Sequence, residues 1–175
     1  MAVIPVKESY PEFEGVPFVK VKGISLLEHS IKNASQSKKV SQITVMSESQ
    51  KVLDFSKNLS AEGKVCKHRL IKREKIKKSK NIPIRDFMTL AGEDYFEEHK
   101  TYPDIIIFLS MHAVNRKKEH IEKALNVLRV TESDSVVSVE EEREPMFSYS
   151  KSGLELINPG TVSYTHLTLP TINWV

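Results

Sequence analysis

The run DIIIFL at residues 104–109 decides the fold class of this chain. It is a continuous, mostly β-branched apolar stretch, which is typical of a parallel strand that is buried on both faces. Apolar residues at helical spacing precede it at residues 84–99 and follow it at residues 117–130. A buried strand between two amphipathic helices indicates βαβ units, in which parallel strands form a sheet and helices cover its faces.

The other elements continue this alternation. Residues 7–23 contain prolines, glycines and acids and are predicted to be a long loop, after which Ser25 is an expected helix N-cap. Further strands are expected at residues 2–6, 42–46, 64–66 and 135–139, a further helix at residues 50–59, and a hairpin at residues 146–149 and 154–157. The sequence therefore predicts a three-layer α/β/α domain, Rossmann-like, with a mainly parallel sheet.

Such a sheet also predicts where a ligand binds. In open α/β sheets, ligands bind in the crevice outside the carboxyl ends of the strands. The loops that follow Val6, Met46 and Leu109 are therefore the expected location of the site.

Composition and charge exclude several classes of protein. Hydrophobic residues make up 39% and charged residues 28% of the 175 residues, which is the balance of a globular domain. The longest apolar run, residues 105–109, is far too short to span a bilayer, so no membrane partner is expected. Cys66 is the sole cysteine and no signal peptide is visible, so we expect a cytoplasmic protein.

The net charge of +3 hides one strongly basic segment. Residues 64–80 contain nine Lys or Arg and a single acid, Glu74. Such a run can hold nucleic acid or a polyphosphate, but it lacks the interleaved aromatic residues on which bases stack. We therefore expect a solvated loop and no nucleic-acid partner, with a polyphosphate ligand as the open alternative.

The end of the chain is expected to have a different origin from the rest. Residues 162–171 read VSYTHLTLPT, which resembles the translation of a common transposase sequencing adapter over ten consecutive residues. We therefore expect residues 1–160 to be a partial domain, truncated at its C-terminal side, and residues 161–175 to be a non-native tail. The alternative is a native, Thr-rich edge strand.

Deleting residues 162–175 is expected to leave the melting temperature unchanged, because an adapter-encoded peptide was never selected to fit this core. Thermal unfolding of the full and the shortened chain checks this expectation. A clear loss of folding after the deletion would show that the tail is native or is part of the sheet.

Five segments resemble the family of CMP–sialic acid synthetases and related sugar-acid cytidylyltransferases. The family begins with a pattern like IPARGGSKGIPRKN followed by GGKPL, and this chain reads IPVKESYPEFEGVP and then VKGISL at residues 4–17 and 21–26. The family's VVSTDDEEI corresponds to VMSESQKV at residues 45–52, and its DIVVLLQPTSPLR to DIIIFLSMHAVNR at residues 104–116. Residues 134–139, DSVVSV, match the family pattern in full.

The resemblance implies a reaction and its partners. A hydroxyl of a sialic-acid-like (nonulosonic) or related sugar acid would attack the α-phosphate of CTP, forming a CMP-sugar and releasing pyrophosphate, normally with Mg²⁺. It implies that the Mg²⁺ ligands lie mostly in later sequence, so we expect activity from a full-length parent rather than from this chain. A homodimer stays open, as do a catalytically weak or silent paralogue and another nucleotide-sugar enzyme on the same scaffold.

The resemblance also nominates site residues. Lys7 stands where the family has an arginine and would contact phosphate, and Arg116 matches a family arginine that would contact sugar or phosphate. Ser110 replaces a glutamine near the nucleotide and could contact the base, whereas Lys20 and Lys22 could restore charge that the first loop has lost. The alternatives are a solvated lysine for each of the three, a strand-end serine, and an arginine that binds backbone carbonyls.

The departures from the family pattern concentrate in the first loop. Glu8, Ser9, Tyr10 and Pro11 stand where Gly-Gly-Ser-Lys is expected, so the loop lacks the glycines that let backbone N–H groups approach a triphosphate. Glu8, Glu12 and Glu14 also add negative charge near the phosphates. His112, Glu119 and His120 fit no standard metal-ligand spacing, and no metal site is expected among them.

Overall fold

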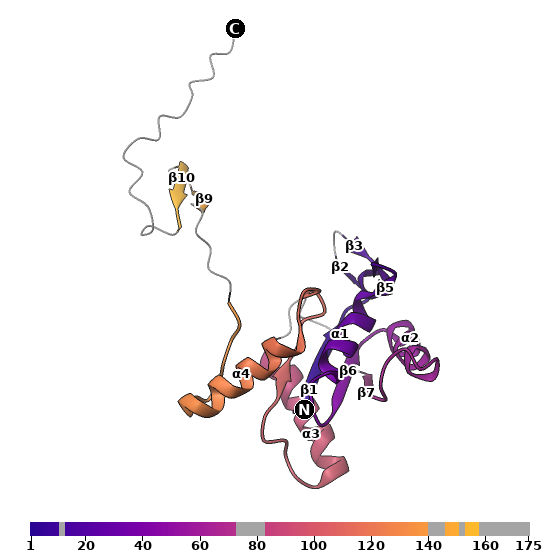
Figure 1. Cartoon of the computed structure of the whole chain (residues 1–175). Coiled ribbons are helices and arrows are strands. Elements are labelled where there is room, and N and C mark those ends of the chain that lie inside the picture. The colour runs from indigo at the N-terminus through magenta and orange to yellow at the C-terminus, as the bar shows by residue number, and fades with distance from the viewer. Residues whose placement is uncertain (11–12, 73–82, 140–145, 151–152, 158–175) are drawn as a thin grey trace. The chain divides into compact units, whose positions relative to one another are not determined.

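The computed structural model describes residues 1–10, 13–72, 83–139, 146–150 and 153–157. The chain divides into two compact units, Met1–Val136 and Val137–Val175. The first unit contains the main sheet and its helices, and the described residues of the second include a hairpin (Figure 1). The tail expected from residue 161 onward lies outside the described residues.

The first unit contains a four-stranded parallel sheet. Its strands are β1 (Ala2–Val6), β6 (Ile43–Ser47), β7 (Arg69–Lys72) and β8 (Ile107–Phe108), and they lie in the order β7-β6-β1-β8. Along the chain this order is 3-2-1-4, the arrangement of doubly wound α/β folds. The predicted α/β class with a parallel sheet is therefore confirmed.

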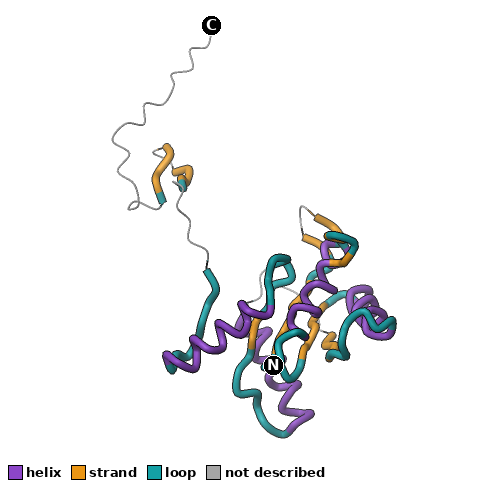
Figure 2. The backbone as a smooth tube through the Cα atoms, viewed as in Figure 1, coloured by secondary structure: helices purple, strands orange, loops and turns teal. Residues whose placement is uncertain are grey.

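Helices cover both faces of this sheet, as the alternation of side chains along β1 shows. Ala2, Ile4 and Val6 join the larger core cluster, which includes residues of α1 (Leu26–Ser35), α2 (Gln50–Ala61) and α4 (Lys118–Thr131). Met1 and Val3 join a smaller cluster with residues of α3 (Ile84–His99). Because successive strand residues point to opposite faces, the two clusters lie on opposite sides of the sheet. Figure 2 shows the course of the backbone through these helices and strands.

Local signals in the sequence set the ends of the first two helices. The Ser25 hydroxyl accepts a hydrogen bond from the Glu28 backbone N–H at 3.2 Å, as expected of an N-cap. Ser49 caps α2 in the same way through the Val52 N–H. After α2 the chain turns at Gly63, whose φ of +70° is readily adopted by glycine.

The stretch between β1 and α1, predicted to be a loop, contains short ordered pieces. These are β2 (Ser9–Tyr10), β3 (Phe13–Glu14), the 3₁₀ turn η1 (Val16–Phe18), β4 (Lys20–Val21) and β5 (Ile24–Ser25). The β4–β5 hairpin turns through Lys22 and Gly23, both with positive φ, as a two-residue hairpin of type I′ requires.

The strand predicted at residues 64–66 is wrong. β7 begins instead at Arg69, inside the basic segment, and pairs with β6. Arg69 fits there because its guanidinium binds Asp94 of α3 through two nitrogens and lies 2.8 Å from Glu98. Two charges of the basic segment, on Arg69 and Lys72, thus belong to an ordered strand, whereas residues 73–80 lie outside the described residues.

The run at residues 104–109 forms a shorter strand than predicted. Only Ile107 and Phe108 pair with β1, and both are half-buried. Among the described strands, β8 lies at the edge of the sheet. Ile105 serves a different purpose, since its carbonyl accepts a hydrogen bond of 2.8 Å from the N-terminal ammonium of Met1.

Residues 135–139 form no strand, contrary to the prediction. Val137 and Val139 are exposed, and no strand pairs with them among the described residues. The hairpin is confirmed, with β9 (Phe147–Ser150) and β10 (Gly153–Leu156) antiparallel. Within the described parts of the chain, no helix has the length and apolarity that crossing a membrane demands.

Candidate functional site

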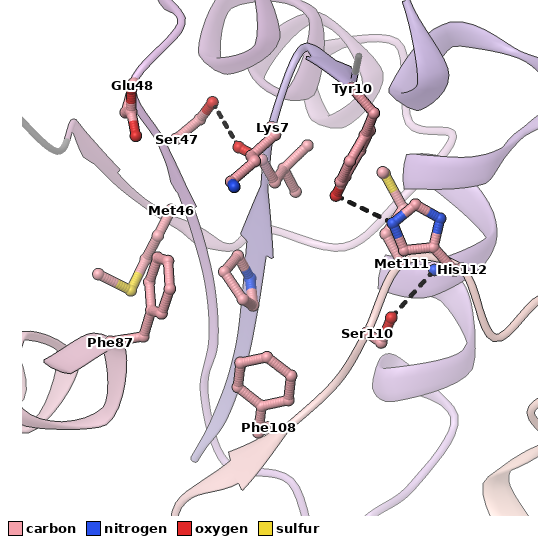
Figure 3. A pocket seen from close by; sticks show the side chains of 12 residues that line it. Lys7, Tyr10, Met46, Ser47, Glu48, Phe87, Phe108, Ser110, Met111 and His112 are labelled. Carbon is pink, nitrogen blue, oxygen red and sulfur yellow. Dashed lines mark hydrogen bonds between the residues drawn. The ribbon is translucent and has the colours of Figure 1, made fainter. Parts of the chain in front are cut away.

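A pocket of about 170 Å³ opens at the carboxyl ends of β1, β6 and β8. Its lining residues come from the ends of these strands, the loops that follow them and helix α3: Pro5, Val6, Lys7, Tyr10, Met46, Ser47, Glu48, Phe87, Phe108, Ser110, Met111 and His112 (Figure 3). The order 3-2-1-4 reverses between β1 and β8, so the pocket lies at the topological switch point of the sheet. The predicted position of the site, at the loops after Val6, Met46 and Leu109, agrees with this pocket.

Hydrogen bonds hold the strand ends that form the floor of the pocket. The buried Ser47 hydroxyl donates to the Val6 carbonyl at 2.9 Å and accepts from the Ser49 N–H at 3.2 Å. The end of β1, the end of β6 and the start of α2 are thereby fixed to one another. Lys7 follows directly after β1 and lines the pocket, with its ammonium 6.0 Å from the centroid of the Tyr10 ring.

Ser110 and Arg116 lie together in the loop after β8. Ser110 lines the pocket, and its hydroxyl accepts from the His112 backbone N–H at 3.3 Å. Arg116 Nη2 donates to the Ser110 carbonyl, whereas Nη1 is buried without a hydrogen-bond partner. Burial lowers the pKa of the Arg116 guanidinium. A buried cation with a free donor is costly, and an anionic ligand nearby would compensate that cost.

Lys20 and Lys22 do not join the other predicted residues at the pocket. Both are exposed on the β4–β5 hairpin, and neither is among the residues that line the pocket. Lys7 and Ser110 thus line the same pocket, Arg116 binds the Ser110 carbonyl without being a lining residue, and the two hairpin lysines lie elsewhere.

Glu8, one of the three acids expected to oppose phosphate binding, is bound by residues outside the pocket lining. The Ser49 hydroxyl donates to Glu8 at 2.6 Å, and Lys51 lies 3.4 Å from the other carboxylate oxygen. These contacts, led by the Ser49 hydrogen bond, lower the pKa of Glu8. Glu8 is not a lining residue, Glu14 is exposed on β3, and Glu12 lies outside the described residues. The negative charge of the first loop is therefore directed away from the pocket at Glu8.

Sequence reasoning missed one pair of side chains at the pocket. The Tyr10 hydroxyl and His112 Nε2 are 2.9 Å apart, and their rings meet edge to face at 5.0 Å. Figure 3 shows the two side chains pointing toward one another from the first loop and from the loop after β8. Burial raises the pKa of Tyr10, so its hydroxyl keeps its proton. The one signal in the sequence was a tyrosine at a position where the family pattern has a small residue. Its partner could not be identified from the sequence, because it lies 102 positions away.

No ready metal site exists among the described residues. They contain no group of three or more His, Cys, Asp or Glu side chains that could hold a metal ion. Glu48 supplies the one carboxylate among the lining residues of the pocket. Mg²⁺ is commonly bound through one or two carboxylates together with substrate phosphates, so the pocket alone supplies at most part of such a set.

Comparison with known proteins adds to this geometry. No protein-family model and no curated protein matches the sequence. Among solved structures, a CMP:2-keto-3-deoxy-manno-octonic acid synthetase complexed with CTP is similar at a TM-score of 0.53 and 21% identity, over 75% of this chain and 48% of that one. A cytidylyltransferase from Leptospira borgpetersenii serovar Hardjo-bovis has a TM-score of 0.53 at 11% identity, over 75% of this chain and 49% of that one.

A third structure covers more of the chain. The 4-diphosphocytidyl-2C-methyl-D-erythritol synthase from Anaerococcus prevotii has a TM-score of 0.59 at 14% identity, over 91% of this chain and 63% of that one. The matched part of this chain spans from about half to under two thirds of the length of these structures. The chain therefore has an α/β fold similar to that of these structures.

Proposed function

We propose that this chain is part of a cytidylyltransferase-like domain whose full-length parent transfers CMP from CTP to a sialic-acid-like or related sugar acid. The observation that carries the proposal is the pocket at the switch point, which Lys7 and Ser110 line in a fold shared with cytidylyltransferase structures. The choice of a sialic-acid-like acceptor rests on the sequence resemblance, most of all on residues 134–139.

The reaction needs charge neutralisation more than covalent help from the protein. The acceptor hydroxyl oxygen bonds to the α-phosphorus, the bond to the β-phosphate oxygen breaks, and the hydroxyl proton is released with pyrophosphate as the leaving group. Lys7 would neutralise phosphate charge at the end of β1, and the buried, unpaired Nη1 of Arg116 would donate a hydrogen bond to a phosphate or carboxylate oxygen. Mg²⁺ would supply further charge to the triphosphate, with Glu48 as its one carboxylate from the pocket lining.

Two measurements test the proposal at different levels. Calorimetric titration of the chain with CTP and with cytidine should show tighter binding of CTP, since only CTP carries the phosphate charge that Lys7 and Arg116 would attract. Pyrophosphate release by the full-length protein, given CTP, Mg²⁺ and a panel of nonulosonic acids, should then identify the acceptor. Equal affinity for CTP and cytidine would contradict a phosphate site in this pocket.

A second candidate is a paralogue that binds a nucleotide with little or no turnover. The observation in its favour is the first loop, where Ser9 and Tyr10 form a strand in place of flexible glycines. Repulsion of phosphate by Glu8 does not support weak catalysis, because the Glu8 carboxylate is already bound by Ser49 and Lys51. Binding of CTP without pyrophosphate release from any acceptor would favour this second candidate.

A further inference from the structure

The hydrogen bond between Tyr10 and His112 can exist in two forms. With a neutral imidazole whose Nε2 is unprotonated, the Tyr10 hydroxyl donates its proton to Nε2 and turns its lone pairs toward other neighbours. The neutral tautomer that carries its proton on Nε2 can donate to the tyrosine oxygen instead, and a protonated imidazole must do so, which leaves the hydroxyl proton free for another acceptor. The 2.9 Å separation suits both forms.

The pair lies where a change of hydrogen-bond direction would be felt by a ligand. Both residues line the pocket at the switch point, and Lys7 lies beside the Tyr10 ring. A phosphate oxygen is an acceptor, so lone pairs on Tyr10 would repel it and a hydroxyl proton would bind it. Histidine is the side chain that ordinarily changes charge between about pH 5 and 8.

We propose that Tyr10 and His112 form a proton-linked relay, which rests on the proposed function: protonation of His112 frees the Tyr10 hydroxyl to donate to a phosphate oxygen in the pocket. The ligand class is a phosphate or pyrophosphate group, alone or as part of a nucleotide. The relay supplies one donor that the Gly-poor first loop does not provide through its backbone. Phosphate binding and proton uptake by His112 then favour one another, as linkage requires.

Other charged groups near the pocket also affect phosphate binding and the protonation of His112. Lys7 comes from the end of β1, Glu48 from the loop after β6, and Arg116 from the same loop as His112. Helix α3 contributes the uncharged Phe87 to the lining. A bound phosphate would attract a proton to His112 by simple Coulomb interaction as well, so the test must separate that effect from the relay.

The test follows the titration of His112 by NMR of ¹⁵N-labelled protein, with and without saturating inorganic pyrophosphate. The His112 signal is assigned by its loss in a His112→Asn variant. In the unaltered chain we expect the titration midpoint to rise by about one pH unit on binding, which corresponds to about tenfold tighter binding to the protonated form. In Tyr10→Phe, which keeps the ring but removes the hydroxyl, we expect less than about a third of that rise.

Tyr102→Phe is the matched control. It removes a tyrosine hydroxyl in the same way, but Tyr102 does not line the pocket. It should show the full rise. An equal rise in Tyr10→Phe and the unaltered chain would assign the effect to Coulomb attraction and overturn the relay, as would no rise in the unaltered chain. CTP that binds no better than cytidine, together with a full pyrophosphate effect, would contradict the proposed function while the relay stands.

Discussion

Replacing Ile4 with alanine is expected to lower the free energy of unfolding by about 2–5 kcal/mol, the usual cost of such a truncation in a closed core. Ile4 is fully buried in β1, which pairs with β6 on one side and β8 on the other. The surrounding strands and α1 leave little room for relaxation, so the cavity would persist. Urea denaturation of the two proteins measures the difference.

Phe108→Ala provides the comparison for this prediction. Phe108 is larger, but it is half-buried on the edge strand β8 and lines the pocket. Its truncation should therefore cost clearly less than that of Ile4, although the residue removed is bigger. The reverse ranking would mean that β8, and not β1, lies at the centre of the folded sheet.

The double replacement of Lys7 and Arg116 by alanine is expected to weaken CTP binding by about tenfold or more, the scale of one lost hydrogen bond to a charged group. Binding of cytidine should change little, because the nucleoside lacks the phosphate charges that these two residues would bind. Arg116 keeps a donor without a partner and Lys7 lies at the pocket, so each has a physical reason to contribute. Calorimetric titration with both ligands gives the two affinities.

Conservative variants separate charge from scaffold. Lys7→Arg keeps the charge and should retain most of the CTP affinity. Arg116→Lys keeps the charge but loses the planar group that both reaches the Ser110 carbonyl and presents Nη1, so it should fall between the alanine variant and the unaltered chain. If CTP and cytidine lose affinity equally in the double variant, both residues have a structural role only.

Some parts of the fold could be read from the sequence because their signals are local. Ser25 and Ser49 are followed by apolar residues at helical spacing, and both cap helices through their own hydroxyls. Strand pairing is different, since it depends on distant partners. Arg69 begins a strand in a basic segment, where Asp94 and Glu98 of the later helix α3 bind its guanidinium. Val137 and Val139 have high β propensity, yet no described strand lies beside them.

The candidate site shows the same division. Its location followed from the alternation of strands and helices, because the carboxyl ends of parallel strands meet at one edge. Lys7 and Ser110 were identified through the family pattern and do line the pocket. The Tyr10–His112 pair could not be found in this way, because both residues differ from the family pattern at their positions and the contact joins two loops that only the fold brings together.

The unequal covering of the two faces of the sheet has a consequence for local opening. On one face three helices bury β1 and β6, whereas on the other the cluster around Val3 and Met46 rests on α3, whose fully buried apolar side chain is Ala91. Regions with fewer buried apolar contacts open at lower free energy than the global transition, so amide protons of α3 should exchange ahead of those of β1. Because α3 also supplies Phe87 to the pocket, a ligand bound there would be released by the same opening. A ligand bound in the pocket would in turn slow amide hydrogen exchange in α3. The exchange rate of this helix would then measure ligand binding even though the helix makes no contact with the phosphate groups.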